Sequence, residues 1–261
     1  MNYCPNCGQQ FERQTNFCRN CGFNLQARSL TATPKPFFTQ LGDVFLVRGF
    51  KVILILLVAQ VISLIVISSL PYFSGEQAFY SQWVQQESAQ FSSLSLFGEF
   101  TGIFTNNLDV ALRMMIPGLG DLVFGGAIYN TSRLLEATAF SRGLQPADLS
   151  VTLALLPHTW IELSAYALAV FEGAYIVYAI VPRRGRKRPV TLRFLGAEVV
   201  VAVVLLALIL LVAAVLEVSL VVLGAYGLLG WVPLSAIAFV IFTVRRRFIR
   251  KGSTPHLPPG L

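Results

Sequence analysis

All four cysteines of the 261-residue chain fall within its first 21 residues, as two Cys-x-x-Cys pairs ten residues apart: Cys4 and Cys7, then Cys18 and Cys21. Four thiolates complete a tetrahedral shell around zinc and leave no open position for catalysis. A glycine follows each pair, where a Cβ would hinder a tight turn. The pattern predicts a structural zinc ribbon over residues 1–26 that folds around its metal, because so short a segment buries little core. Two disulfides are the alternative, which the paired spacing and a reducing cytoplasmic location disfavour.

A second group of chemically capable residues lies in the apolar stretch 149–181. On a helix that turns by roughly 100° per residue, His158, Glu162 and Glu172 fall within about 80° of arc, interleaved with alanines. Because an ionised carboxylate facing lipid costs about 2.5–3.5 kcal/mol on insertion scales, this polar stripe is expected to face other helices. Arg133 is the first candidate to neutralise Glu162 or Glu172. The full set of expected partners is Asn106, Asn107, Asn130, Arg133 and Glu136.

The polar stripe admits several interpretations: a buried network that fixes helix register, a path for an ion or proton, part of a metal site, or an intramembrane hydrolase that uses Glu162. A His and a Glu four residues apart supply only two metal ligands, and the sequence has no His-Glu-x-x-His motif. It also has no nucleophile–base pair, phosphate-binding glycine loop or cofactor fingerprint, and the other histidine, His256, lies in a Pro-rich tail. The sequence therefore predicts a protein that is not an enzyme and whose cofactor is structural zinc.

The elements that position these residues must be membrane helices. Hydrophobic residues make up 55% of the chain and charged ones 13%, about half the usual charged fraction of roughly 25% in soluble domains. Apolar runs such as 52–70 and 199–216 approach the roughly 20 residues that a helix needs to cross a bilayer. They do not alternate with polar residues, as a β-barrel would require. The predicted fold class is an all-α polytopic membrane protein with a small N-terminal zinc ribbon.

The net charge of +7 is distributed in a way that predicts topology. Basic residues cluster beside apolar runs, in the first 51 residues, in 183–193 and in the tail 245–251. This is the positive-inside pattern, so both termini are expected in the cytoplasm and the protein in the cytoplasmic membrane. No basic residue stands between Lys51 and Arg113, so segment 71–99 is expected outside. The basic flanks suit anionic lipid rather than nucleic acid, and no cleavable signal peptide precedes the first anchor.

Six spans follow from the apolar stretches. The first is near 50–70, and the external segment 71–99 carries aromatic residues suited to an interfacial helix. An odd number of crossings must join this segment to the next basic loop, and three apolar stretches are available there. The five later stretches are 103–116, 119–140, 149–181, 194–216 and 220–244. Because 100–117 is short for a full span, a re-entrant helix is the alternative.

The chain divides by composition into four parts. They are the zinc ribbon, 1–26; a linker and interfacial segment, 27–49; the transmembrane helical domain, 50–247; and a basic, Pro-rich cytoplasmic tail, 248–261. Two further acidic residues, Glu198 and Glu217, stand near opposite ends of the fifth span. They are expected at the two membrane interfaces.

Residues 103–175 resemble the stage II sporulation protein M family. The resemblance rests on a double Asn, a Gly-rich turn, an Asn, a Pro-His followed by Glu, and a Glu-Gly-Ala: Asn106–Asn107, Gly118 and Gly120, Asn130, Pro157–His158 with Glu162, and Glu172–Gly173–Ala174. Thr131 and Thr159 depart from glycines that are usual in the family. The ribbon and the sixth span are not general family features. The resemblance implies a role that family members have in spore formers, where they assist septal peptidoglycan remodelling without acting as enzymes.

Two functions follow as hypotheses. The first is a non-enzymatic scaffold or assembly factor for an envelope complex. Its zinc ribbon would bind a cytoplasmic protein, its segment 71–99 would meet envelope components, and a homo-oligomer is compatible with this role. The alternative is a transporter or channel subunit that uses the polar stripe.

Overall fold

The computed structural model describes residues 2–3, 10–11, 20, 37–181 and 192–252, which belong to two compact units, residues 1–40 and 41–261. In the first unit, β1 (Asn2–Tyr3) pairs antiparallel with β2 (Gln10–Phe11). The four cysteines, the linker 27–36 and the segment after 252 lie outside the described residues. The two strands flank the first cysteine pair in the sequence.

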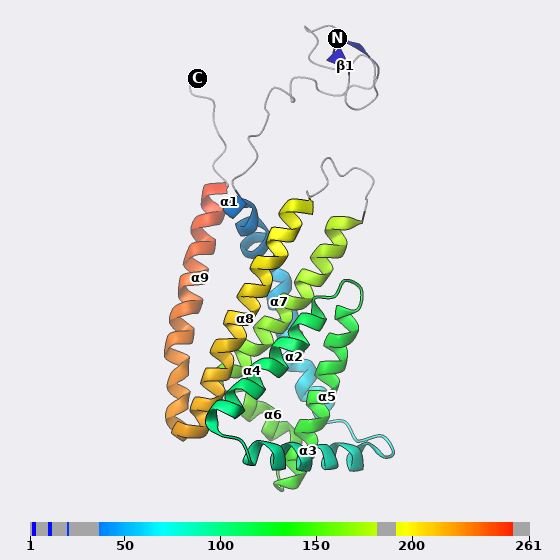
Figure 1. The fold of residues 1–261 in the computed structure, drawn as a ribbon, viewed down its shortest axis with the longest axis vertical. Helices are drawn as coiled ribbons and strands as arrows, with labels where there is room; N and C mark the ends of the chain where they lie inside the picture. Colours follow the sequence, from blue (N-terminus) through cyan, green and yellow to red (C-terminus); the bar gives the residue numbers. More distant parts are fainter. Residues whose placement is uncertain (1, 4–9, 12–19, 21–36, 182–191, 253–261) are drawn as a thin grey trace. The chain divides into compact units, whose positions relative to one another are not determined.

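The described part of the second unit is a bundle of helices (Figure 1). In chain order they are α1 (Phe37–Gly42), the π-helical η2 (Asp43–Gly49), α2 (Phe50–Ser68), α3 (Glu76–Ser92), α4 (Leu96–Met114), α5 (Gly120–Ser141), α6 (Pro146–Ala154), α7 (Pro157–Ile180), α8 (Leu192–Leu223), the 3-10 turn η3 (Gly224–Gly230) and α9 (Trp231–Gly252). The predicted all-helical membrane architecture is therefore confirmed in class. The stretch predicted as one span over 149–181 is two helices, because Pro157 has no N–H and begins α7.

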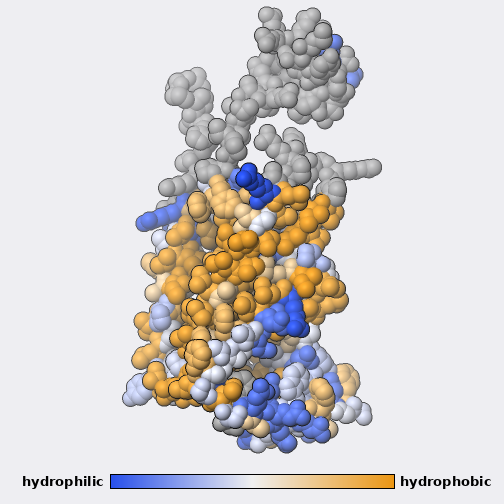
Figure 2. Space-filling view, viewed as in Figure 1, coloured by the Kyte–Doolittle hydropathy of each residue, from blue (hydrophilic) through white to orange (hydrophobic). Residues whose placement is uncertain are grey.

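Three stretches of the described chain are long and apolar enough to cross a membrane: Phe37–Ser68, Pro157–Ile180 and Leu192–Ile249. The last of these contains α8 and α9, which reverse at η3 (Figure 1). Apolar side chains cover most of the visible face of these helices, whereas hydrophilic ones gather at the end where α3 lies (Figure 2). The helices thus present a lipid-facing surface, as a polytopic membrane protein requires.

Helix α7 is the centre of the bundle and packs against α2, α4, α5 and α8. More than half of its residues are buried. Ala165, Ala167 and Ala169 have no exposed surface, and such small side chains allow neighbouring helices to approach closely. The fully buried Leu206 and Leu210 of α8 belong to the same apolar core.

Helices α4 and α5 form a hairpin that enters the bundle and turns back. Its turn needs glycine, since Gly118 has φ +80° and a Cβ on Gly120 would stand 1.9 Å from the Met114 carbonyl oxygen. The turn meets α7 at Gly173, where a Cβ would stand 3.1 Å from the same oxygen. Helices α7 and α8 continue beyond the turn (Figure 1). The hairpin has the form of the re-entrant alternative, and the predicted six full crossings are not confirmed.

Helix α3 lies across the end of the bundle at which α4 begins and α5 ends (Figure 1), and it packs against α5. Helix α4, which was predicted as a short helix over 103–116, begins earlier, at Leu96, because Ser95 caps it: the Ser95 hydroxyl accepts a hydrogen bond from the Gly98 N–H at 3.2 Å.

Helix α9 packs chiefly against η2 and η3, at its two ends. Near its start, the Trp231 indole donates to the Leu155 carbonyl at 2.9 Å. Near its other end, Arg245 Nε donates to the Leu46 carbonyl at 2.9 Å and its guanidinium lies 4.3 Å from the centre of the Phe50 ring. The end of α9 thereby returns to the start of α2.

Candidate functional site

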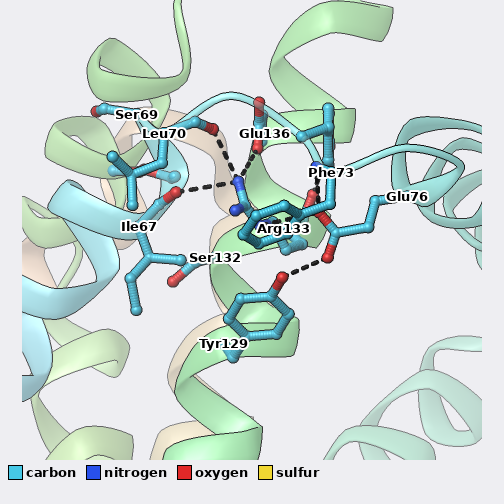
Figure 3. Close-up of polar contacts among 12 residues, drawn as sticks. Ile67, Ser69, Leu70, Phe73, Glu76, Tyr129, Ser132, Arg133 and Glu136 are labelled. Atoms are coloured by element: carbon cyan, nitrogen blue, oxygen red, sulfur yellow. Dashed lines mark hydrogen bonds and ion pairs between the residues drawn. The ribbon is translucent and has the colours of Figure 1, made fainter.

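Arg133 of α5 is almost completely buried, with 1% of its surface exposed. Its Nη1 donates to Glu136 Oε2 at 2.8 Å, and to the carbonyl oxygens of Leu70 at 2.8 Å and Ile67 at 3.3 Å. Its Nε lies 3.8 Å from Glu76 Oε2. Figure 3 shows these contacts converging on one guanidinium. A single cation therefore joins α5 to the last turn of α2, the connection after it and the start of α3.

Aromatic rings complete this site. The Arg133 guanidinium carbon lies 5.3 Å from the centre of the Tyr72 ring and 5.2 Å from that of Tyr129, within cation–π range. The Tyr129 hydroxyl donates to Glu76 Oε1 (Figure 3). The Arg133 cluster is defined as Tyr72, Glu76, Tyr129, Arg133 and Glu136. It fixes α3 across the end of the bundle.

The expected pairing of Arg133 with Glu162 or Glu172 is wrong, because Arg133 lies level with the last turn of α2 and binds Glu136 there. Asn130 likewise accepts a hydrogen bond from Tyr80 of α3 at 2.8 Å. Two of the expected partners, Arg133 and Asn130, therefore contact α3 instead, and Glu136 binds Arg133. The other two lie on α4, where Asn106 donates to the buried Asn107 at 3.3 Å.

Acidic pH is expected to weaken the attachment of α3 to α5 through Glu76. The Tyr129 hydrogen bond lowers the pKa of Glu76 below its ordinary value of 4.5, and the Phe73 N–H and the Arg133 charge lower it further. A lowered pKa means that the stabilisation is fully present above pH 4.5 and is lost as the pH falls through the folded-state value. We expect the protection of the α3 amides, which is their exchange relative to the intrinsic rate at the same pH, to fall below pH 4.5. E76Q should exchange faster at neutral pH and show no further change; an identical acid response in E76Q would contradict the assignment.

The polar stripe divides into two sites in the structure. His158 and Glu162 line a cavity of about 230 Å³, and Glu217 of α8 lines it from another side. Glu162 accepts a hydrogen bond from the Tyr166 hydroxyl at 2.8 Å. His158 is buried, and its Nδ1 has no hydrogen-bond partner among the described residues. This cavity is the first site, and Glu217, which was expected only at the membrane interface, is part of it.

Glu172 belongs to the second site. Its carboxyl group lies against that of Glu198 of α8, and both residues have no exposed surface. Glu198, which was expected at the membrane interface, is buried in the contact between α8 and α7. The buried Ala165 and Ala169 occupy the turns of α7 between the two sites.

Sequence reasoning missed the roles of Glu198, Glu217 and Glu76. A glutamate within an apolar run is a usable signal for the first two, since burial in a helical bundle explains its presence better than contact with lipid does. The partnership of Glu76 with Arg133 has no local signal, because it depends on how α3 folds back onto α5.

The zinc ligands can be assessed only by their chemistry, since no group of three or more His, Cys, Asp or Glu side chains converges within the described ranges and the cysteines fall outside them. Four cysteines in two knuckle-spaced pairs fit a structural zinc ion. The antiparallel pairing of β1 with β2 places Tyr3 opposite Gln10, and these two residues flank the first cysteine pair in the sequence. The zinc would stabilise the ribbon and carry out no reaction.

C18S should lose the bound zinc and expose residues 1–26 to protease, because three thiolates leave the tetrahedral shell incomplete. The helices should remain in the membrane, since the chain's contacts separate residues 41–261 from the first unit. Metal content and limited proteolysis measure the two effects. A C18S chain with full zinc content would contradict the assignment.

The apolar helices and their buried polar sites define a polytopic α-helical membrane protein. The family model of Stage II sporulation protein M matches residues 52–220, and that of a zinc-ribbon domain matches residues 1–25. The chain therefore belongs to the Stage II sporulation protein M family, and an N-terminal zinc ribbon precedes the family region. No curated protein and no solved structure matches the chain. The family match ends within α8 and leaves α9 outside it.

Proposed function

We propose that the protein is a non-enzymatic scaffold of the cytoplasmic membrane, with both termini in the cytoplasm. The observation that carries this proposal is the fixed position of α3, which the Arg133 cluster holds across one end of the bundle. A helix held through Glu76 by a buried arginine and a tyrosine hydroxyl presents a defined surface. By the positive-inside rule, that surface lies outside the cell membrane, where envelope components are met.

The surface of α3 has the composition of a binding face. Phe79 is 59% exposed, and its ring packs edge-on against Tyr80 and Trp83. Aromatic side chains are enriched at protein interfaces because they offer large, rigid contact areas. At the other side of the membrane, a zinc ribbon offers a second docking module. The chain would thus join an envelope component to a cytoplasmic protein.

Cross-linking from native membranes tests the two contacts separately. A photo-reactive residue at position 79 should capture an envelope protein, and deletion of residues 1–26 should leave that product unchanged while a cytoplasmic partner is lost. Position 122 is the control, since Leu122 is 73% exposed and lies at the start of α5 rather than on α3. If positions 79 and 122 give the same products, the α3 surface has no specific partner and the proposal fails.

Transport of a proton or small ion is a second candidate, favoured by the cavity that His158, Glu162 and Glu217 line. Reconstituted wild-type protein would then carry a flux that H158A and E162Q lose while they keep their fold. A scaffold would show no flux in any of these chains.

A further inference from the structure

Glu172 and Glu198 are two acidic side chains buried next to each other in the contact between α7 and α8. Both side chains are fully buried on the facing helices α7 and α8. None of their four carboxyl oxygens has a hydrogen-bond partner among the described residues. Two ionised carboxylates in contact repel strongly where water is excluded. The pair as arranged therefore holds fewer than two negative charges.

No described cation donates a hydrogen bond to either carboxyl group. On α4, which packs against both helices, Arg113 is bound to Asp109 at 2.7 Å, and both side chains are more than half exposed. Asp121, at the tip of the hairpin, is acidic and exposed. The charge of Arg133 is taken up by Glu136 and Glu76 at the other end of the bundle. His158, Glu162 and Glu217 line the separate cavity.

A metal ion fits this pair poorly. Calcium takes about six to eight oxygen ligands and magnesium demands a nearly ideal octahedron, whereas two carboxyl groups offer few ligands. A third metal-binding side chain is absent from the described surroundings. A proton needs only two carboxyl oxygens that are close to each other. We propose that Glu172 and Glu198 share one exchangeable proton and form a proton-binding site between α7 and α8.

A cavity at the hairpin tip lies beside this site. A cavity of about 230 Å³ is lined by Gly118, Asp121, Gly173 and Ala174, so it reaches the residue next to Glu172. That volume holds several waters at roughly 30 Å³ each. Toward the other site, the buried alanines of α7 and Leu206 of α8 close the path. Loss of the shared proton would place two charges in the α7–α8 contact and loosen it beside the hairpin.

Carbodiimide labelling tests the proposal. Dicyclohexylcarbodiimide enters apolar sites and reacts with protonated carboxyl groups: the carboxyl oxygen bonds to the central carbon, the proton moves to a nitrogen, and the adduct rearranges to a stable N-acylurea. The full chain in lipid nanodiscs should take one adduct on Glu172 or Glu198. Labelling should fall as the pH rises from about 5 to about 9, a range in which an isolated glutamate, with a pKa of about 4.3, is already ionised.

Matched variants locate the proton. The E172Q/E198Q double variant should lose the adduct and the exchangeable infrared band of a protonated carboxyl, while E162Q, in the separate cavity, should keep both. Labelling of the wild type is informative even if a variant fails to fold. Absence of an adduct and band at every pH would show an ionised pair and overturn the proposal. If sodium or magnesium at constant pH reduced the labelling, the pair would bind a metal ion rather than a proton, and the proposal would fail. If the labelling did not change with pH, the proton would not be exchangeable, which would also overturn the proposal.

Discussion

Replacing Arg133 with methionine is expected to lower the free energy of unfolding in detergent by about 3–5 kcal/mol. Glu136, which is 3% exposed, would be left as an uncompensated buried charge. The carbonyl oxygens of Ile67 and Leu70 would also lose their donor. Denaturant titration measures the loss, and hydrogen exchange should show α3 detached from α5.

Two further variants, R113M and R133M/E136L, serve as controls for R133M. R113M removes an arginine whose ion pair with Asp109 is exposed, and such pairs contribute about 0–1 kcal/mol. R133M/E136L removes both buried charges, which should recover most of the lost stability because apolar replacements of a buried pair are often neutral, while α3 stays loose. An R133M chain as stable as R113M would show that the Arg133 cluster does not hold the bundle together.

Replacing Gly120 with alanine is expected to cost at least about 3 kcal/mol, above the usual range for overpacking. The new Cβ would meet the Met114 carbonyl oxygen at 1.9 Å, and that oxygen belongs to the backbone and cannot turn aside. The hairpin would have to open, and its contact with Gly173 would be lost. Thermal unfolding of the purified chain measures the effect.

Gly126 provides the matched control, since it lies on the same helix and a Cβ there meets nothing within 4 Å. G126A should leave the stability unchanged or raise it by up to about 1 kcal/mol, because alanine favours helix. Equal unfolding temperatures for G120A and G126A would show that the turn does not require its glycine.

The sequence allowed the long apolar elements to be predicted, because hydropathy and length alone determine them. Helix α2 lies where its apolar run predicts, and Pro157 begins α7 as its missing N–H requires. The reversal between the last two helices lies later than the predicted 216–220, because α8 continues to Leu223 and α9 begins at Trp231. The depth of the α4–α5 hairpin could not be predicted in the same way. It depends on how closely Gly173 approaches the hairpin turn, which is a contact between distant segments.

In the candidate sites too, features set by the local sequence could be predicted, whereas contacts between distant segments could not. Helical periodicity placed His158 and Glu162 on one face, and both line one cavity. Periodicity could not choose partners, so Arg133 was assigned to the wrong carboxylates. That choice depends on which helices lie level with one another, and Glu172 meets Glu198 only because α7 and α8 run antiparallel in contact.

Helix α9 is attached to the rest of the bundle near each of its two ends. The contacts of Trp231 with Leu155 and of Arg245 with Leu46 hold α9 to the bundle at two positions 14 residues apart. The helical stretch between them has a fixed length of about 21 Å at 1.5 Å per residue. A displacement of α9, such as one caused by a change in bilayer thickness, would therefore act on the start of α2, where Arg245 holds the chain.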